Sequence, residues 1–537
     1  CIDFADLMLS GIEMDAENII FKEGRLSLDL KSLSAVDKSG YSLQELKGKF
    51  SLGDGKAMLE EMVLRDNFST INADCFYMGY KTPRSFAYFC DSIQLHLSAN
   101  NSYFSFRTLG YLREEFKSNN IGLFFSGSVD GPIAALQSER LNVSLENGIT
   151  NLNVKFRIDS LPNPRQALLQ GQILNGFTCG KDVAMIVSQF SGNEEIPAIR
   201  NFAPFKIFNL DGKISGRFHK LNFLTALHSK ELFIRSGITY ENLQDRILLG
   251  GWANVEHFNA EALLQNVPIA SIKATLPSIT ITTLKGGRGT TVNADSLKIR
   301  ELQAGGYTYR NIVADGQYSK GLSKVRVTSN DPALKFAMEA SYSGLAEEKC
   351  LKVPYLNLAT ADLCALKLLD REEGAKLSLS ALCNLSLSNK GYINGNAALN
   401  EITFSNAEGQ HPIGNILISS NQGPELCTTK VDSDFAELLF SGNSTIEQFV
   451  EDIINASPDK DIERFHSHSK SNGNGTAAGS RDRFDGRNYR ISLQTHNTVN
   501  LMEMIAPQLF IQPDTRLELE YAESDFKVGV KSGRVAL

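Results

Sequence analysis

The sequence lacks the features by which an enzyme or a membrane-spanning protein is most easily recognised. It contains no Walker loop, GxSxG elbow, HExxH pair or dinucleotide fingerprint, so no catalytic constellation can be named. No apolar run approaches the length that a helix needs to cross a bilayer. No basic run is interleaved with aromatic residues, and the net charge of −7 argues against a nucleic-acid partner, whose phosphates call for a basic face. We therefore expect no enzyme, no cofactor and no nucleic-acid binding.

Cysteine is also scarce, with eight residues among 537, wide and irregular spacing, and no CxxC. In a chain of this length the pattern argues against a disulfide framework, and it leaves oxidation between distant pairs open. Cys1 has two explanations: the lipidated first residue of a mature lipoprotein, or an arbitrary boundary of the sequence. The chain enters an amphipathic pattern at once, without the polar tether of a lipoprotein, and this favours the second.

Two further groups of residues have the composition of a binding site. His466 and His468 lie near Asp461 and Glu463, which would give a metal two imidazoles and a carboxylate. They sit in a polar segment with nothing to orient the ligands, so we expect no metal site. The glycine-rich run at 286–289 lacks the Lys-Ser/Thr of a phosphate loop and is interpreted as a turn between strands.

What the sequence has in abundance is the alternation of apolar and polar residues. From Phe208 to Phe218 every second residue is apolar or glycine, with Asn, Asp, Lys, Ser and Arg between them. The same pattern recurs at Leu152–Ile158 and at Leu377–Leu387, where Leu382 is the one lapse. Successive side chains of a strand point to opposite faces, so each segment predicts a strand with one apolar and one wet face.

Such alternation predicts strands along most of the chain, separated by turn signals. The predicted strand segments are Leu26–Leu30, Ile93–Leu97, Leu123–Val129, Leu141–Leu145, Leu152–Ile158, Phe208–Phe218, Leu232–Ile234, Leu297–Ile299, Tyr307–Tyr309, Leu334–Ala340, Leu377–Leu387, Ile402–Phe404, Tyr489–Leu493, Leu517–Tyr521 and Phe526–Val530.

Predicted helices are few and short. The clearest begins at the capping residue Ser444 and runs to 455, with Ile446, Phe449 and Ile453 on one face. That apolar stripe is expected to dock against the sheet. Weaker candidates cover 105–117, 181–190, 257–265 and 498–509.

Residues 457–487 are polar, rich in glycine and serine, and nearly free of apolar anchors, which predicts a flexible polar loop. The strand pattern resumes after it. We therefore expect one elongated β body over 1–456 that continues over 488–537, rather than two separate domains.

Several stretches together resemble the AsmA-like envelope proteins, especially the TamB-related members of the Bacteroidetes. They include FAPFKIFNLDGKISGRF at 202–218 and FFSGSVDGPIAALQSERLNVSLENGITNLNVKFRIDSLPN at 124–163. Residues 267–344 follow the family's order of a sheet segment, a Gly-Tyr-x-Tyr-x-Asn-Ile strand and an Asp-Pro strand, and 414–454 continue it. Each motif is short and degenerate, and the resemblance covers nearly the whole chain in a consistent order.

The resemblance implies a mainly β protein built as a long, curved, mostly antiparallel sheet (a β-taco, or repeating β-groove) with a hydrophobic trough. It implies a place in the periplasm, with an inner-membrane anchor in the full-length protein. Related proteins are thought to move phospholipids between inner and outer membranes along the trough. Others are thought to assist outer-membrane protein assembly with a TamA-type partner. The family's membrane helix and C-terminal module are not visible here, so we expect an internal portion.

On this interpretation the alternating apolar residues line the trough and meet phospholipid acyl chains. The predicted lining residues are Leu152, Val154, Phe156, Ile158, Phe208, Leu210, Ile214, Phe218, Leu297, Ile299, Leu377, Leu379, Leu385 and Leu387.

The residues alone leave another architecture open, because most alternating strands bury their apolar faces against each other in a sandwich or in stacked barrels. Two features favour the trough. The strands recur along the chain without the linkers that would separate compact sandwiches, and the helices are too few to cover such a sheet.

Overall fold

The computed structural model describes residues 8–537 apart from 112–113, 162, 164, 191–204, 264–266, 287–288, 345–347, 370–373, 447, 450–486, 507, 523–524, 533–534 and 537. Internal contacts divide the chain into two units, Cys1–Thr291 and Val292–Leu537. Each unit is described by itself, as unit 1 and unit 2.

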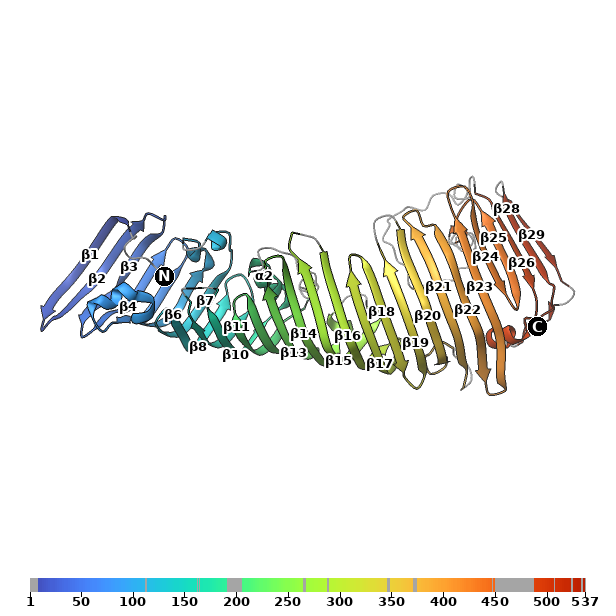
Figure 1. The fold of residues 1–537 in the computed structure, drawn as a ribbon, viewed down its shortest axis with the longest axis horizontal. Helices are drawn as coiled ribbons and strands as arrows, with labels where there is room; N and C mark the ends of the chain where they lie inside the picture. The colour runs from blue at the N-terminus through green and yellow to red at the C-terminus, as the bar shows by residue number, and fades with distance from the viewer. Residues whose placement is uncertain are drawn as a thin grey trace. The chain divides into compact units, whose positions relative to one another are not determined.

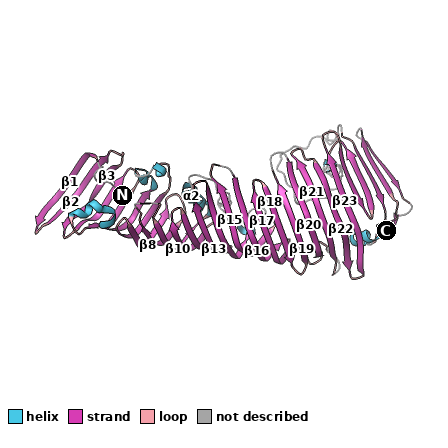
Figure 2. Ribbon diagram, in the orientation of Figure 1, coloured by secondary structure: helices cyan, strands magenta, loops and turns pink. Residues whose placement is uncertain are grey.

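Antiparallel strands make up most of the described chain (Figures 1 and 2). The described residues form a sheet of 28 strands that is not closed, and a separate pair of two-residue strands, β27 and β30. This confirms the predicted mainly β, antiparallel class. A sandwich needs a second sheet and a barrel needs a closed one, and the described part of the chain contains neither beyond that short pair.

The strands of unit 1 follow one another in chain order, each paired with the next. They are β1 (Leu9–Lys22), β2 (Arg25–Asp37), β3 (Ser42–Gly53), β4 (Lys56–Asp66), β5 (Thr70–Gly79), β6 (Gln94–Ser105), β7 (Gly122–Gly131), β8 (Ala135–Leu145), β9 (Asn151–Asp159), β10 (Leu168–Thr178), β11 (Phe208–Arg217), β12 (Lys220–His228), β13 (Leu232–Asn242), β14 (Arg246–Asn259) and β15 (Ile269–Leu284).

Strand β16 (Gly289–Ala304) contains the boundary between the units. The strands of unit 2 that follow it are β17 (Tyr307–Ser319), β18 (Leu322–Asn330), β19 (Leu334–Ser343), β20 (Glu348–Asp362), β21 (Lys376–Ser388), β22 (Ile393–Asn406), β23 (Gly409–Gln422), β24 (Cys427–Ser433), β25 (Ala436–Gly442), β26 (Tyr489–Thr495), β27 (Phe510–Ile511), β28 (Arg516–Ala522), β29 (Asp525–Lys531) and β30 (Val535–Ala536).

Every strand segment predicted from alternation lies in a strand, and only Ile93 and Phe218 fall one residue outside. Two of the strands that the sequence did not reveal, β20 and β12, have their alternation interrupted. In β20 the pairing register shifts between Val353 and Leu356. In β12, Leu224 and Ala226 place apolar side chains on the side that also carries Lys220, Asn222 and His228. A bulge inserts a residue and moves the following side chains to the opposite face, so the period of two is lost in the sequence.

The helices are short segments beside the strands (Figure 2). The prediction over 181–190 corresponds to α2 (Gly180–Phe190), and the prediction over 498–509 to α6 (Val499–Ile505). At 257–265 only α4 (Ala260–Leu263) is helical, because β14 runs to Asn259. At 105–117 the structure has the 3-10 segments η2 (Phe106–Tyr111) and η3 (Glu114–Phe116) instead of one α-helix. Before β6 lie η1 (Pro83–Tyr88) and α1 (Phe89–Ser92).

The helix predicted to start at Ser444 is instead capped by Thr445. The Gln448 backbone N–H donates to Thr445 Oγ1 at 3.2 Å, and the Thr445 backbone N–H donates to Gln448 Oε1 at 3.1 Å. These reciprocal bonds form a capping box, which satisfies two backbone N–H groups at once. Ile453 and the loop predicted over 457–487 lie outside the described residues, apart from Arg487. The strands on either side of that loop, β25 and β26, are paired antiparallel.

Candidate functional site

The candidate site is, in each unit, an apolar face that the strand pairing assembles from single alternating strands. Directly opposed residues of an antiparallel pair lie on the same face of a sheet. In unit 1 we define the apolar face as the side of the sheet that carries Phe156, and in unit 2 as the side that carries Leu399. The opposite side is the polar face.

In unit 1 one row of opposed residues runs across seven consecutive strands. It begins at Phe156 in β9 and ends at Ile279 in β15. The row is Phe156, Gly171, Ile214, Phe223, Ile238, Gly251 and Ile279. No polar side chain interrupts it, because the register of every pair brings apolar residues or glycines into line.

Neighbouring rows repeat the arrangement. One contains Ile158, Leu169, Gly216, Leu221, Tyr240, Leu249 and Ile281. Another crosses the earlier strands through Leu28, Phe50, Leu59, Phe76, Leu97 and Val129. Burial raises the pKa of the Tyr240 hydroxyl above its usual value, outweighing the hydrogen bond with Asn242 that lowers it. The single ionisable side chain among these rows is therefore neutral at physiological pH.

In unit 2 a row of apolar residues runs across nine strands, from β20 to β29. It consists of Val353, Cys383, Ala397, Ile418, Val431, Leu438, Leu493, Leu517 and Val530. At the usual spacing between paired strands such a row measures roughly 38 Å across the sheet. A parallel row contains Met338, Leu356, Ala381, Leu399 and Ile416.

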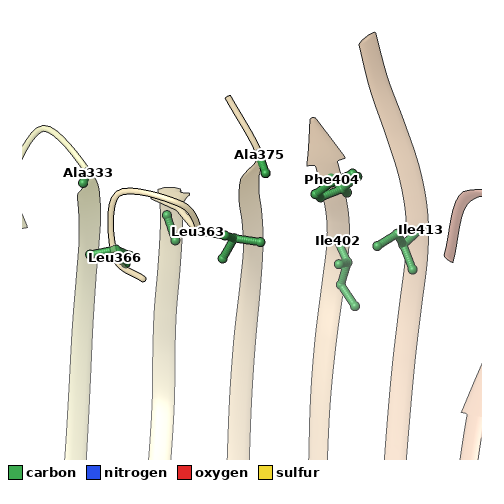
Figure 3. Close-up of a cluster of buried hydrophobic side chains, with 8 residues drawn as sticks. Ala333, Leu363, Leu366, Ala375, Ile402, Phe404 and Ile413 are labelled. Atoms are coloured by element: carbon green, nitrogen blue, oxygen red, sulfur yellow. The ribbon is translucent and has the colours of Figure 1, made fainter. Parts of the chain in front are cut away.

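One end of the apolar face of unit 2 is closed by a buried cluster at the ends of β19 to β23. Leu363 and Leu366, from the segment that joins β20 to β21, pack there with Ile402, Phe404 and Ile413 (Figure 3). Helix α6 adds Leu501 and Met504, and Asn500 Nδ2 donates to the Pro412 carbonyl at 2.7 Å. This cluster buries the ends of the strands and leaves their middles outside it.

A second cluster closes the opposite ends of the neighbouring strands. Phe440 and Tyr489 are buried there with Cys427 and Tyr521, and Phe449 packs onto them. The Phe449 ring lies 5.0 Å from the Tyr489 ring and 5.8 Å from the Phe440 ring, between centroids. The predicted docking of Ile446 and Phe449 against the sheet is confirmed. The row from Val353 to Val530 runs between the two clusters, and its side chains are half-buried except the exposed Val530.

The structure places the predicted lining residues unevenly. Leu152, Val154, Phe156, Ile158, Leu210, Ile214, Leu297, Ile299 and Leu385 are half-buried strand residues, and Leu387 is exposed. Phe208 is only 2% exposed at the start of β11. Phe218 follows the last residue of β11 and is exposed. Leu377 and Leu379 pack against the cluster around Phe404.

Other members of the apolar face were missed from the sequence. Phe223 and Leu221 alternate in β12, but Leu224 beside them obscures the pattern. Ile279 and Ile281 in β15 are separated from Leu276 by a register shift. In each of these strands two large apolar residues stand two positions apart, and this short alternation was the sequence signal that could have identified them.

The polar face carries ion pairs, two of them between neighbouring strands and one within β9. Lys155 Nζ lies 2.5 Å from Glu139, Arg157 Nη2 lies 2.9 Å from Asp159, and Lys220 Nζ lies 3.3 Å from Glu241. Exposed pairs of this kind contribute at most about 1 kcal/mol each. Tyr103 donates to Glu146 Oε2 at 2.7 Å. The pKa of Tyr103 is raised to about 12. Burial is the larger cause, and the hydrogen bond to Glu146 is the second.

The described part of the chain offers no group of His, Cys, Asp and Glu side chains suited to a metal ion. His466 and His468 lie outside it. Cys90 is disulfide-bonded, and Cys75, Cys179, Cys350, Cys364, Cys383 and Cys427 are free thiols. None of the helices in the described ranges combines the length and apolar character that a membrane span requires.

Comparison with known proteins gives neither a matching family model nor a matching curated protein. The likeness to AsmA-like proteins therefore stays a prediction from the sequence.

Proposed function

We propose that the apolar face binds lipid acyl chains and conducts phospholipid between the inner and outer membranes, with the protein located in the periplasm. The observation that supports this proposal is the register itself. Rows of apolar residues continue across seven strands of unit 1 and nine strands of unit 2, without a charged side chain in either row.

The free energy of burying an acyl chain on the apolar face is compatible with a ligand that moves along it. Each methylene that leaves water gains about 0.8 kcal/mol, so a long acyl chain gains on the order of 10 kcal/mol. A row without polar side chains offers no specific partner that would fix the chain at one position. An acyl chain is therefore bound by the apolar row as a whole and can still slide along it.

Lipid occupancy is tested on the purified chain by native mass spectrometry and by solvent extraction. Co-purified phospholipid at a defined stoichiometry is the expected result. A phospholipid with a photoreactive diazirine on its acyl chain then locates the contact. Crosslinks should reach Ile214 and Phe223 and should skip Ser215 and Asn222, their neighbours on the polar face. Equal labelling of both faces, or a lipid-free protein, would refute acyl-chain binding.

A second candidate function is a scaffold or chaperone for outer-membrane protein assembly, with a TamA-like protein as a partner. The observation that favours it is β1, which pairs only with β2 among the described strands. Its side chains Met14, Ile20 and Phe21 are largely exposed. Exposed edge strands are usually protected, and an apolar one can accept a strand from another protein.

The two functions are separated by a photo-crosslinking amino acid placed either at Phe21 or at Ile214. The lipid-conduit function predicts lipid adducts at Ile214 and no protein adduct at Phe21. The scaffold function predicts adducts of an unfolded outer-membrane protein at Phe21, and an Ile214 position that stays free of lipid.

A further inference from the structure

The polar face of unit 1 carries an apolar hollow of about 450 Å³ over β10 to β14, with Trp252 among its lining residues; we call it the Trp252 hollow. It lies on the side of the sheet opposite the proposed lipid-binding face. The pairing registers of β10 to β14 place Gln172, Lys213, Leu224, Gly237 and Trp252 in one row. Elsewhere in this row, and in the adjacent rows of the polar face, most side chains are polar. The volume falls in the range of small binding sites.

The position of the Trp252 side chain depends on Gly237, which has no side chain of its own. A Cβ at Gly237 would stand 2.8 Å from Cε2 and 3.2 Å from Cδ1 of Trp252, and still closer to Nε1. The indole therefore lies across the glycine, and it remains 42% exposed. Leu224, on the other side of Gly237 in the row, is 54% exposed. Two large apolar side chains are thus presented together on a face where neither is needed for a core.

Two cations line the same hollow without a carboxylate partner. Lys213 and Arg235 form no ion pair in the described part of the chain, whereas Lys155, Arg157 and Lys220 on the same face are paired. The Arg235 guanidinium lies over the Phe233 ring at 4.9 Å. Asp211 also lines the hollow, and its Oδ2 lies 3.5 Å from His228 Nδ1. The positive charge at the rim is therefore available to an incoming anion.

We propose that the Trp252 hollow docks a segment of a partner protein that presents an apolar side chain beside a carboxylate. The apolar side chain would pack on Trp252, Leu224 and Ala226, and the carboxylate would accept hydrogen bonds from Lys213 and Arg235. Exposed tryptophan and arginine are the residues that most often dominate protein interfaces. Charge-assisted bonds to lysine and arginine provide the orientation. Most of the surface that lines the hollow is apolar, which suits an apolar side chain better than the hydroxyl-rich surface of a sugar.

A selection from a displayed random heptapeptide library tests the proposal without a known partner. The wild-type chain is the target, and the Trp252→Ala chain removes peptides that bind elsewhere. Enriched peptides should carry Asp or Glu within two positions of Leu, Ile, Phe or Tyr. No enrichment over Trp252→Ala, or enriched peptides without an acidic residue, would overturn the proposal.

An enriched peptide is then titrated against the chain, with Trp252 as the reporter, because it is the only tryptophan of the sequence. Binding should shift the indole emission to shorter wavelength and saturate. Lys213→Ala and Arg235→Ala should each weaken binding at least fivefold, and both keep the reporter. Arg217→Ala is the matched control. Arg217 lies on the same strand as Lys213, β11, and on the same face of the sheet, but outside the hollow. Circular dichroism verifies that each variant is folded.

Two other occupants are outcomes of the same titration. Anionic phosphatidylglycerol vesicles or glucuronic acid could produce the shift. If either binds with an affinity equal to that of the peptide, and with the same dependence on Lys213 and Arg235, the hollow is a lipid-surface or acidic-sugar site and the protein-docking proposal is wrong. Replacement of Asp and Glu in the peptide by Asn and Gln should weaken the binding of the peptide at least fivefold. Unchanged binding would contradict the role of Lys213 and Arg235.

Discussion

Ile214 leans across Gly171 on the neighbouring strand. A Cβ at Gly171 would stand 2.6 Å from Cγ2 of Ile214, too close for the two to coexist without movement. Gly171 is also the residue opposite Phe156. The glycine therefore gives Ile214 room within the apolar row, and β9, β10 and β11 are coupled at this point.

This relationship gives a first prediction on stability. Gly171→Ala should destabilise unit 1 by about 1–2 kcal/mol, because the added methyl group overpacks against Ile214. The free energy is measured by urea unfolding. In the Gly171→Ala, Ile214→Ala double variant the methyl group finds space, so the combined loss should be smaller than the sum of the single losses. Simple additivity would mean that the two side chains do not interact.

A second prediction concerns the apolar face as a lipid-binding surface. Ile214→Asp places a carboxylate in the row, and an acyl chain that passes it would have to desolvate the charge at a cost of several kcal/mol. Acyl-chain crosslinking should fall at least tenfold. Ser215→Asp adds the same charge one residue away on the polar face and should leave crosslinking unchanged. Equal losses in both variants, at equal folded fractions, would contradict a one-sided site.

The same test in unit 2 requires a residue outside the buried clusters. Leu379 is unsuitable, because it packs against the cluster around Phe404 and a charge there would unfold the strand ends. Leu385 lies in β21 away from that cluster, opposite Leu351 and Gly395. Leu385→Asp should abolish lipid labelling of unit 2 in the folded chain, and Asn384→Asp, its exposed neighbour, should not. Retained labelling in Leu385→Asp would exclude this part of the face.

A fourth prediction addresses the helix that begins after Thr445. Phe449 is 6% exposed and contacts the rings of Phe440 and Tyr489. Phe449→Ala should lower the free energy of unfolding of unit 2 by about 3 kcal/mol, as measured by urea denaturation. Leu439→Ala is the control, since Leu439 is exposed on the opposite face of β25 and should cost less than about 1 kcal/mol. A Phe449→Ala chain as stable as the control would show that the helix does not hold the cluster together.

A fifth prediction follows from Asp182 in α2, whose carboxylate is almost completely buried. It accepts hydrogen bonds from the backbone N–H groups of Ile149 and Thr150, both at 2.9 Å, and from Thr150 Oγ1 at 2.6 Å. Burial raises the pKa of this carboxyl, but the hydrogen bonds outweigh it, and the pKa lies below its usual value of 3.8. The ionised form is therefore favoured in the folded state.

The sign of the pH dependence follows from this lowered pKa. The stabilisation is complete above the pKa of the unfolded state and is lost as the pH falls through the lower pKa of the folded state. Asp182→Asn should cost roughly 2 kcal/mol at pH 7. The difference between wild type and variant in urea unfolding should shrink as the pH falls below about 4. A difference that does not change with pH in the acidic range would show that the charge does not contribute.

The strands were largely predictable from the sequence, because the pleat of a strand is a local property. Alternation at Phe208–Phe218 or Leu377–Leu387 identifies both the strand and its apolar side without knowledge of any neighbour. Predictions failed where a local irregularity broke the period, as with the register shift after Val353 or the apolar Leu224 on the polar face. The first predicted cap, Ser444, was displaced by one residue, since the capping box depends on the side chain of Gln448 as well.

By itself the sequence determined that this protein is built from amphipathic strands and that each strand has an apolar side. Only the tertiary structure decided that these sides fall into continuous rows, that clusters around Phe404 and Phe440 close their ends, and that Trp252 lies across Gly237. These features depend on the register between different strands, which turns and bulges set pair by pair. A shift of one residue between β10 and β11 would place Ile214 opposite Gln170 or Gln172 instead of Gly171 and would interrupt the row. No pattern within a single strand reports that alignment.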